Sequence, residues 1–148
     1  VEEAFSTFNA VSLFAKGVKT ILENSFEANT KACDLKKESL ARVAYDENTI
    51  TGKVLYIDSF GNAISNIEKS TFDRVHKARV FTIYVQGPHI KIRSISRGYY
   101  QGNPGGIMAL FNSLGFLEIA VYMDSLAKLE SIVPGAEIRI KFDNEQGK

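Results

Sequence analysis

Two short polar segments are the strongest candidates in this sequence for binding chemistry. They read DSFGN at 58–62 and NSLG at 112–115, and each follows a run of apolar residues. In both segments small polar side chains stand beside a glycine, which allows a ligand to approach the backbone closely. The same residue types are typical of β-turns in which Asp58 and Asn112 bond their own backbone. From the residues alone both interpretations stay open.

Side chains that usually carry catalysis or bind metals are few. The sequence has no glycine-rich phosphate loop, no nucleophile elbow and no Cys/His cluster with metal-ligand spacing. His76 and His89 fall in predicted surface turns, where we expect solvated polar side chains. Cys33 lies in a polar stretch, and we interpret it as an unreactive bystander. We therefore predict no metal site and no cofactor.

Composition excludes several classes of protein. The 148 residues include 18 Lys+Arg and 17 Asp+Glu, the net charge is +1, and 45% are hydrophobic. These values exclude intrinsic disorder, collagen-like sequence and a highly charged nucleic-acid tail. No apolar run approaches the roughly 20 residues that span a bilayer, and Glu2 and Glu3 do not resemble a signal-peptide start. We expect a soluble, cytoplasmic protein.

The elements that position the two polar segments follow from periodicity. Apolar residues from Val11 to Leu22 recur at helical spacing and predict a helix. Residues 27–48 are polar and charged and predict a connector, so we place a domain boundary between 48 and 49. Because Val1 is not an initiator methionine, we expect a processed product or a fragment.

After Thr49 the pattern changes to short strands separated by Gly, Pro and Asn. The sequence predicts two short helices, at 70–75 with a Ser70 or Thr71 cap and at 125–132. Many short strands at regular spacing predict a mainly β fold, an antiparallel barrel or sandwich. The predicted strands are 53–57, 63–67, 80–85, 90–92, 107–111, 117–121 and 138–142.

Two stretches, GKVLYIDSFGNAISNI and ALFNSLGFLEIAV…PGAEIRI, resemble the C-terminal domain of the S-adenosylmethionine (SAM) hydroxide adenosyltransferases. These enzymes are adenosine-forming SAM hydrolases related to the bacterial fluorinase and chlorinase. The resemblance runs from about Gly52 to Phe142. A weaker match at Ser6-Thr7-Phe8 is similar to the Thr-Phe-His-Gly-Arg-Asp motif of the family's N-terminal domain.

The resemblance implies an antiparallel β-barrel (49–148) preceded by a helical segment and connector (1–48) left from an α/β N-terminal domain. It also implies a homotrimer, in which the nucleoside site lies between the N-terminal domain of one subunit and the C-terminal domain of its neighbour. A small-molecule nucleoside, SAM or adenosine, is the expected ligand, with neither membrane nor nucleic acid as partner.

Carried over by position, Asp58 would contact the methionine amino group, and Asn62 would read adenine with both its acceptor and its donor. Ser113 would bind the methionine carboxylate and Tyr99 would flank the purine. The backbone from Val121 to Met123 would line the adenine edge. The implied ligand-binding residues are Asp58, Phe60, Asn62, Tyr99, Asn112, Ser113, Val121 and Met123, with Thr7 and Phe8 as further candidates.

The reaction that the resemblance implies is displacement at the ribose C5′ carbon by water, with methionine as the leaving group. This chain departs from the family pattern at the catalytic histidine, where it has Asn9, and at the following Arg-Asp, where it has Val11-Ser12. The Asp and Arg partners are expected upstream of Val1, and Leu114 stands where halogenating relatives have arginine. Asparagine cannot accept a proton at neutral pH, so we expect the chain alone to be inactive.

Two other functions remain open. One is a degenerate relative that binds SAM or adenosine without hydrolysing it. The other is a small OB-like barrel that binds single-stranded nucleic acid, because basic and aromatic residues alternate in one stretch. The net charge of +1 weakens the nucleic-acid hypothesis, and a solvated strand face explains the same pattern. The residues concerned are Lys91, Arg93, Arg97, Tyr99 and Tyr100.

Overall fold

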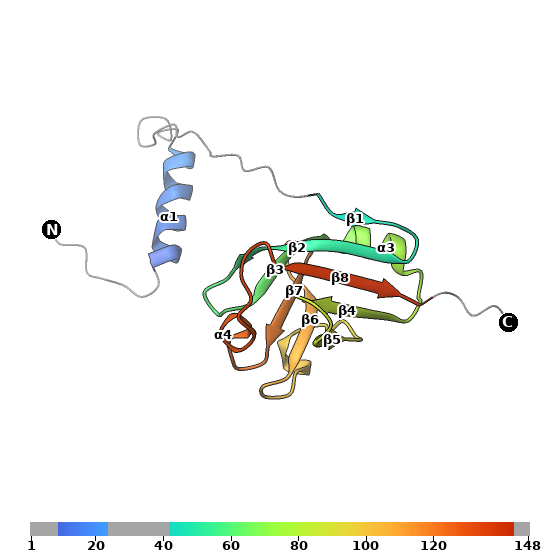
Figure 1. Cartoon of the computed structure of the whole chain (residues 1–148). Coiled ribbons are helices and arrows are strands. Elements are labelled where there is room, and N and C mark those ends of the chain that lie inside the picture. Colours follow the sequence, from blue (N-terminus) through green and yellow to red (C-terminus); the bar gives the residue numbers. More distant parts are fainter. Residues whose placement is uncertain (1–8, 24–41, 144–148) are drawn as a thin grey trace. The chain divides into compact units, whose positions relative to one another are not determined.

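The computed structural model describes residues 9–23 and 42–143 (Figure 1). The chain divides into two compact units, residues 1–38 and residues 39–148. The described part of the first unit is helix α1 (Asn9–Leu22), which the apolar spacing predicts. The strands of the described residues all lie in the second unit. The domain boundary placed after residue 48 stays a prediction.

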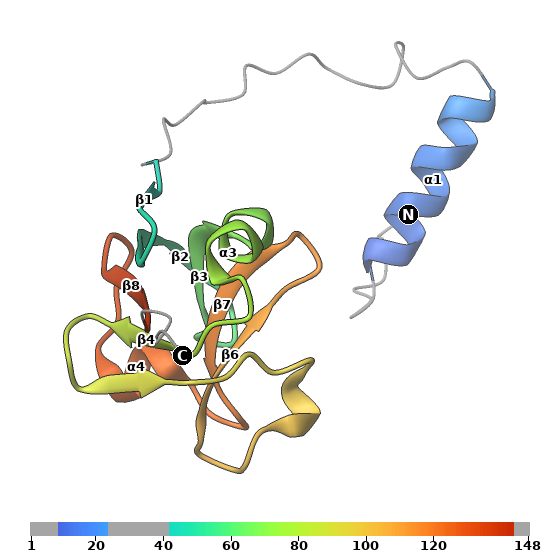
Figure 2. The same ribbon diagram turned by 90° about the vertical axis from the view of Figure 1, so that its right-hand side faces the viewer.

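The second unit is built on one antiparallel sheet, which confirms the predicted mainly β, barrel-like fold. The strands run in the order β5-β4-β8-β2-β3-β7-β6, and β1 pairs with β2. Ser96 N donates to Ala109 O at 2.7 Å, so the segment after β5 meets β6 and the barrel is nearly closed (Figure 2). The strands are β1 (Ala44–Tyr45), β2 (Thr49–Ile57), β3 (Ala63–Glu68), β4 (Phe81–Val85), β5 (Ile90–Ile92), β6 (Ile107–Phe111), β7 (Phe116–Val121) and β8 (Glu137–Phe142).

Strand β2 curves the sheet around the core because its two halves pair with different strands. Its residues 49–53 pair with β8, and its residues 54–57 pair with β3. The register shifts between Val54 and Tyr56, and such irregularities bend and twist a strand. The inward-facing side chains then meet in one apolar core. Its fully buried members include Ile50, Ile83, Leu117, Ile119, Ile138 and Ile140.

Two short helices pack on the barrel, as predicted: α3 (Lys69–His76) after β3 and α4 (Leu126–Glu130) after β7. Phe72 and Leu126 are their buried anchors. The predicted Ser70 or Thr71 cap is wrong. The N-cap of α3 is Glu68, without a side-chain cap bond, because β3 runs directly into the helix. Ser70, inside the first turn, donates to Glu68 Oε2 at 2.9 Å.

His76 is not the solvated turn residue that the sequence predicts. It ends α3, half-buried, with its ring stacked on Phe72 at a centroid distance of 4.9 Å. His89 is exposed in the β4–β5 turn, as predicted. Cys33 lies outside the described residues. We call the rings that meet beside α3 the aromatic cluster: Phe72, His76, Phe81, Phe111 and Phe142.

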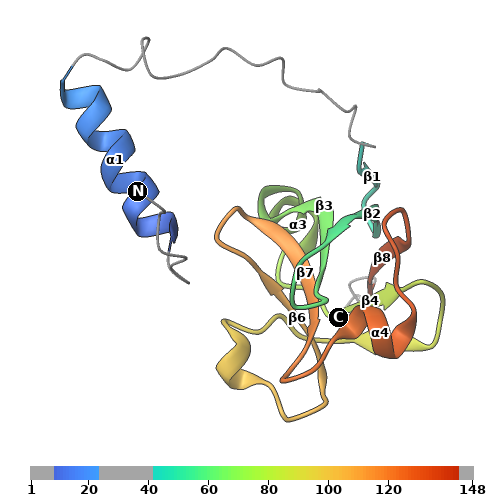
Figure 3. The same cartoon turned by 90° about the vertical axis from the view of Figure 1, so that its left-hand side faces the viewer.

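The loop between β5 and β6 runs beside β6 (Figure 3). A second, smaller apolar group, separate from the main core, consists of Met108, Leu110 and Ala120 with Tyr122 packed against it. This loop contains the 3-10 helix η1 (Tyr99–Gln101). Gly102 fits tightly here, because a Cβ at this position would lie 2.8 Å from Tyr122 Cβ. The loop therefore lies close against the sheet and holds Tyr99 in place.

Candidate functional site

Segment 58–62 joins β2 to β3 in a tight turn that Asp58 organises. Asp58 Oδ1 accepts from the backbone N–H groups of Phe60 and Asn62, both at 2.9 Å. Gly61 N donates to the Asp58 carbonyl at 3.0 Å, and Gly61 has a φ of 86°. Glycine adopts this left-handed conformation without steric cost. The turn interpretation is therefore confirmed for Asp58, one of whose carboxylate oxygens builds the turn.

Helix α4 holds this turn from behind. Ala127 N donates to Gly61 O at 3.0 Å. A Cβ added to Gly61 would lie 2.0 Å from Ser125 Oγ, well inside contact distance. Glycine is thus required at position 61 both by its backbone conformation and by the approach of α4.

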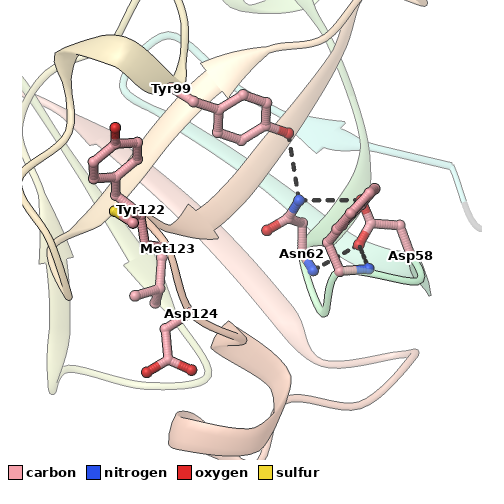
Figure 4. Close-up of a pocket in the computed structure, with 8 residues that line it drawn as sticks. Asp58, Asn62, Tyr99, Tyr122, Met123 and Asp124 are labelled. Atoms are coloured by element: carbon pink, nitrogen blue, oxygen red, sulfur yellow. Dashed lines mark hydrogen bonds between the residues drawn. The ribbon is translucent and has the colours of Figure 1, made fainter.

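A chain of hydrogen bonds links the turn to the η1 loop and to β7 (Figure 4). Asn62 Nδ2 donates to Asp58 Oδ2 at 3.1 Å and to Tyr99 Oη at 3.3 Å. The Tyr99 hydroxyl donates to Glu118 Oε1. Asn62 and Glu118 are only 5% and 4% exposed. Such buried polar groups are stable only when hydrogen-bonded.

The environment of Tyr99 keeps its phenol protonated. Burial raises the pKa of Tyr99 well above its ordinary value of 10.0, and the hydrogen bond to Glu118 raises it further. The negative charges of Glu118 and Asp58 act in the same direction. Tyr99 is therefore a neutral hydrogen-bonding group at physiological pH.

A pocket of about 570 Å³ opens beside this network. Its volume falls in the range of small-molecule sites, roughly 300–1,000 Å³. Figure 4 shows three segments converging on it: the β2–β3 turn, the η1 loop and the chain after β7. The lining residues are Asp58, Phe60, Asn62, Tyr99, Val121, Tyr122, Met123 and Asp124.

The lining combines negative charge with exposed apolar groups. Asp58 and Asp124 each bring a carboxylate, and none of the described lining residues is cationic. This distribution favours a ligand that carries positive charge. Phe60 and Met123 are 76% and 80% exposed, and exposed apolar groups around a hollow are typical of a surface that contacts a ligand or another chain. Met123 has a φ of 63°, a strained conformation for a residue other than glycine.

The pocket brings together six of the residues that the sequence singles out, whereas Asn112 and Ser113 lie elsewhere. Asn112 Oδ1 accepts from Leu114 N at 3.0 Å and Phe116 N at 3.2 Å, the same pattern as Asp58. Its turn meets the start of α3, where Lys69 N donates to Gly115 O at 2.8 Å.

The resemblance implies that residues of both turns contact one ligand, but within a single chain the two turns do not line one pocket. Strands β3 and β7 are antiparallel, with Ala63 opposite Ile119 and Glu68 opposite Phe116. The two turns consequently lie at opposite ends of these strands. The ligand contacts of Asn112 and Ser113 stay predictions. Thr7 and Phe8 lie outside the described residues.

Sequence reasoning missed two residues of this site, Glu118 and Asp124, and gave Tyr122 a backbone role alone. Glu118 alternates with Leu117 and Ile119, a pattern that indicates a solvent-facing polar residue on a half-buried strand. The η1 loop covers that face, and no local signal shows it. Asp124 and Tyr122 follow a predicted strand end, where the sequence offered only a backbone role for positions 121–123.

Metal-ligand clusters and membrane-spanning helices are both absent from residues 9–23 and 42–143. Among the described residues, no three His, Cys, Asp or Glu side chains gather as a metal site. Over the same residues, no helix combines the length and apolar character needed to cross a membrane.

Fold and site together define a small β-barrel that presents a negatively charged pocket at its surface. Residues 52–139, more than half of the chain, match the SAM hydroxide adenosyltransferase C-terminal domain. The chain belongs to this family. It is 30% identical over 143 residues to the (R)-S-adenosyl-L-methionine hydrolase of Methanocaldococcus jannaschii. That match covers 91% of this chain and 49% of the hydrolase, so the chain spans about half the length of this curated relative.

A solved structure shows the same fold. An uncharacterised conserved protein from Thermotoga maritima superposes with a TM-score of 0.57 and 23% sequence identity. The superposition covers 74% of this chain and 42% of the Thermotoga protein.

Proposed function

We propose that this chain binds SAM or adenosine in the pocket beside Asn62, as the nucleoside-binding half of a SAM hydrolase. The convergence of Asp58, Asn62 and Tyr99 on one pocket of about 570 Å³ carries the proposal. Asp58 and Asn62 belong to the same turn, whereas Tyr99 lies 37 residues beyond Asn62 in the chain. The family resemblance assigns all three to the ligand, and the named M. jannaschii relative is a SAM hydrolase.

Charge supports a SAM-like ligand. SAM carries a sulfonium and an ammonium group, and the pocket offers the carboxylates of Asp58 and Asp124. The sulfonium charge disappears as the C5′–S bond breaks, so a carboxylate close to sulfur would stabilise the substrate more than the transition state. A carboxylate at the ammonium group binds both states equally. The family resemblance gives this role at the ammonium group to Asp58.

The exposed rim supports a composite site. Phe60 and Met123 stand at the pocket, and their side chains are mostly exposed. In our proposal a neighbouring subunit covers them, completes the site and excludes water from the reacting atoms. The oxygen of one water molecule would then bond to C5′ as methionine leaves and a proton is released. The chain alone binds the nucleoside without hydrolysing SAM, because Asn9 cannot act as a base.

Calorimetric titration with SAM and adenosine tests this proposal. We expect weak binding of both ligands to the wild-type chain. Asp58→Asn should weaken the binding of SAM by about tenfold, because the SAM ammonium group loses a charge-assisted contact. Asp46→Asn is the matched control, because Asp46 Oδ1 also accepts a turn N–H, from Asn48, outside the pocket lining. Chromatography should detect no adenosine formed from SAM.

Three results would contradict the proposal. They are the absence of SAM and adenosine binding, equal losses in both aspartate variants, and SAM hydrolysis by the chain alone. Tight binding of an oligonucleotide that weakens with salt and survives Asp58→Asn would favour the nucleic-acid alternative instead.

A further inference from the structure

Glu118 is a buried carboxylate that lies behind the pocket rather than in its lining. It sits on β7, opposite Ile64 of β3 and Leu110 of β6. Only 4% of it is exposed, and its Oε1 accepts the hydrogen bond of the Tyr99 hydroxyl. Burying a carboxylate is costly unless it is well paired. The Glu118 carboxylate therefore determines where the proton of the Tyr99 hydroxyl points.

The Tyr99 hydroxyl donates to Glu118 and accepts from Asn62. A tyrosine hydroxyl has one proton to donate and lone pairs that accept. The proton of Tyr99 goes to Glu118, so toward Asn62 the hydroxyl can only accept. On the other side of the amide stands Asp58 Oδ2, which accepts as well. Two acceptors therefore flank the Asn62 amide, and only its NH₂ end satisfies both.

The orientation of the Asn62 amide is thereby set. With both N–H groups engaged, Oδ1 is directed away from Asp58 and Tyr99, toward the Tyr122 and Met123 side of the pocket (Figure 4). The donor contact to a ligand that the resemblance also implies for Asn62 stays a prediction. In this structure both side-chain donors are already used within the protein.

We infer that Glu118 is a positioning residue, which acts through Tyr99 to present Asn62 Oδ1 to the ligand as an acceptor only. The pocket then selects a ligand that donates a hydrogen bond at this point. A 6-aminopurine such as adenosine donates from its exocyclic nitrogen. A 6-oxopurine such as inosine places an acceptor there and leaves two acceptors facing each other. The purine preference rests on the proposed function, whereas the amide orientation does not.

Hydrogen exchange of the Asn62 side-chain amide, followed by NMR without ligand, tests the orientation. We expect slow exchange in the wild type and in Glu118→Gln, because the glutamine oxygen still accepts from Tyr99. In Glu118→Leu the hydroxyl proton is free to turn, and exchange should be faster by about fivefold or more. Tyr99→Phe removes the acceptor itself and should act in the same way.

Dissociation constants of adenosine and inosine test the selection. The wild type should prefer adenosine by about tenfold or more, since a mismatched polar group is left unpaired. Glu118→Gln should keep this ratio within about twofold, and Glu118→Leu should bring it close to one. Ser65→Ala is the control for general destabilisation, because buried Ser65 Oγ donates to Leu117 O outside this network. It should keep the wild-type ratio.

The outcomes separate the two proposals. The positioning role is overturned if Glu118→Leu exchanges its Asn62 amide as slowly as the wild type and keeps the wild-type preference for adenosine over inosine. If the wild type binds neither nucleoside while amide exchange still responds to Glu118→Leu, the positioning role holds and the purine preference is refuted. Should Glu118→Leu fail to fold, Tyr99→Phe decides, because Tyr99 is 42% exposed and its ring is retained. Slow exchange and an unchanged ratio in that variant refute the inference.

Discussion

At the scale of single residues, Tyr99 connects the pocket to the barrel. It accepts from Asn62, which lines the pocket, and donates to Glu118, which lies on β7. The ring itself lines the pocket. One side chain therefore combines an aromatic surface for a ligand with a hydrogen bond that orders its neighbour.

The raised pKa of Tyr99 predicts how stability depends on alkaline pH. In the unfolded chain the phenol titrates near its ordinary value of 10.0, whereas the folded protein keeps the proton to higher pH. Between these two values the folded state binds more protons than the unfolded state, so the free energy of unfolding falls as pH rises. Below pH 10 this contribution is fully present.

Urea unfolding of the wild type and Tyr99→Phe between pH 8 and about 11.5 measures this effect. The wild type should lose stability more steeply above pH 10 than Tyr99→Phe. Tyr100→Phe, in which Tyr99 is untouched, should follow the wild type. Parallel curves for the wild type and Tyr99→Phe would refute the assignment.

Met123 is expected to lower the stability of the fold while it strengthens ligand binding. Its φ of 63° costs a non-glycine residue about 1–2 kcal/mol, and its exposed side chain contributes little burial in return. Met123→Gly should raise the free energy of unfolding by about 1 kcal/mol and weaken adenosine binding, since it removes part of the pocket wall. Gln86→Gly is the control: φ at Gln86 is 48°, in the β4–β5 turn and outside the pocket. It should stabilise the protein without changing affinity, and a loss of affinity there would contradict the argument.

At the scale of elements, the two polar turns share one backbone design. In each, the first side chain accepts from the N–H groups two and four residues later, and glycine stands fourth with φ of 86° or 81°. They differ in their surroundings. Ser125 presses against Gly61, whereas nothing lies within 4 Å of a Cβ at Gly115.

This difference predicts unequal costs for the same substitution. Gly115→Ala should lower the free energy of unfolding by about 1–2 kcal/mol, the cost of a left-handed alanine. Gly61→Ala should cost clearly more, because it adds a clash with Ser125 to the same backbone strain. Thermal or chemical unfolding of the two variants measures the gap. Equal costs would show that α4 yields freely and does not hold the turn.

The elements were far easier to predict from the sequence than the site. Alternation of apolar and polar residues indicates strands such as β4 and β8, since one face of each is buried. The residue types in the two turns also predict that Asp58 and Asn112 bond the backbone of their own turns. The role of Glu118 has no local signal, because a loop more than ten residues away in the chain covers it. The separation of the two turns depends on how β3 pairs with β7, which alternation does not determine.

At the scale of the whole barrel, the pocket and the aromatic cluster occupy different ends. The pocket adjoins α4 through Gly61 and Ser125. The aromatic cluster lies beside α3, with Phe72 against Phe81, Phe111 and Phe142. The sheet between them packs around a continuous apolar core. Substitutions in the aromatic cluster should therefore change stability without changing ligand binding.

Phe72→Leu tests this separation. Phe72 is 4% exposed and contacts three other phenylalanine rings, so its replacement should lower the free energy of unfolding by about 1–2 kcal/mol. Because none of these rings lines the pocket, the dissociation constant of adenosine, measured where the variant is fully folded, should stay within about twofold of the wild type. A larger change in affinity would mean that packing at the α3 end reaches the Asn62 network through β3 and β7. In that case the barrel would couple its two ends rather than hold the pocket as a rigid frame.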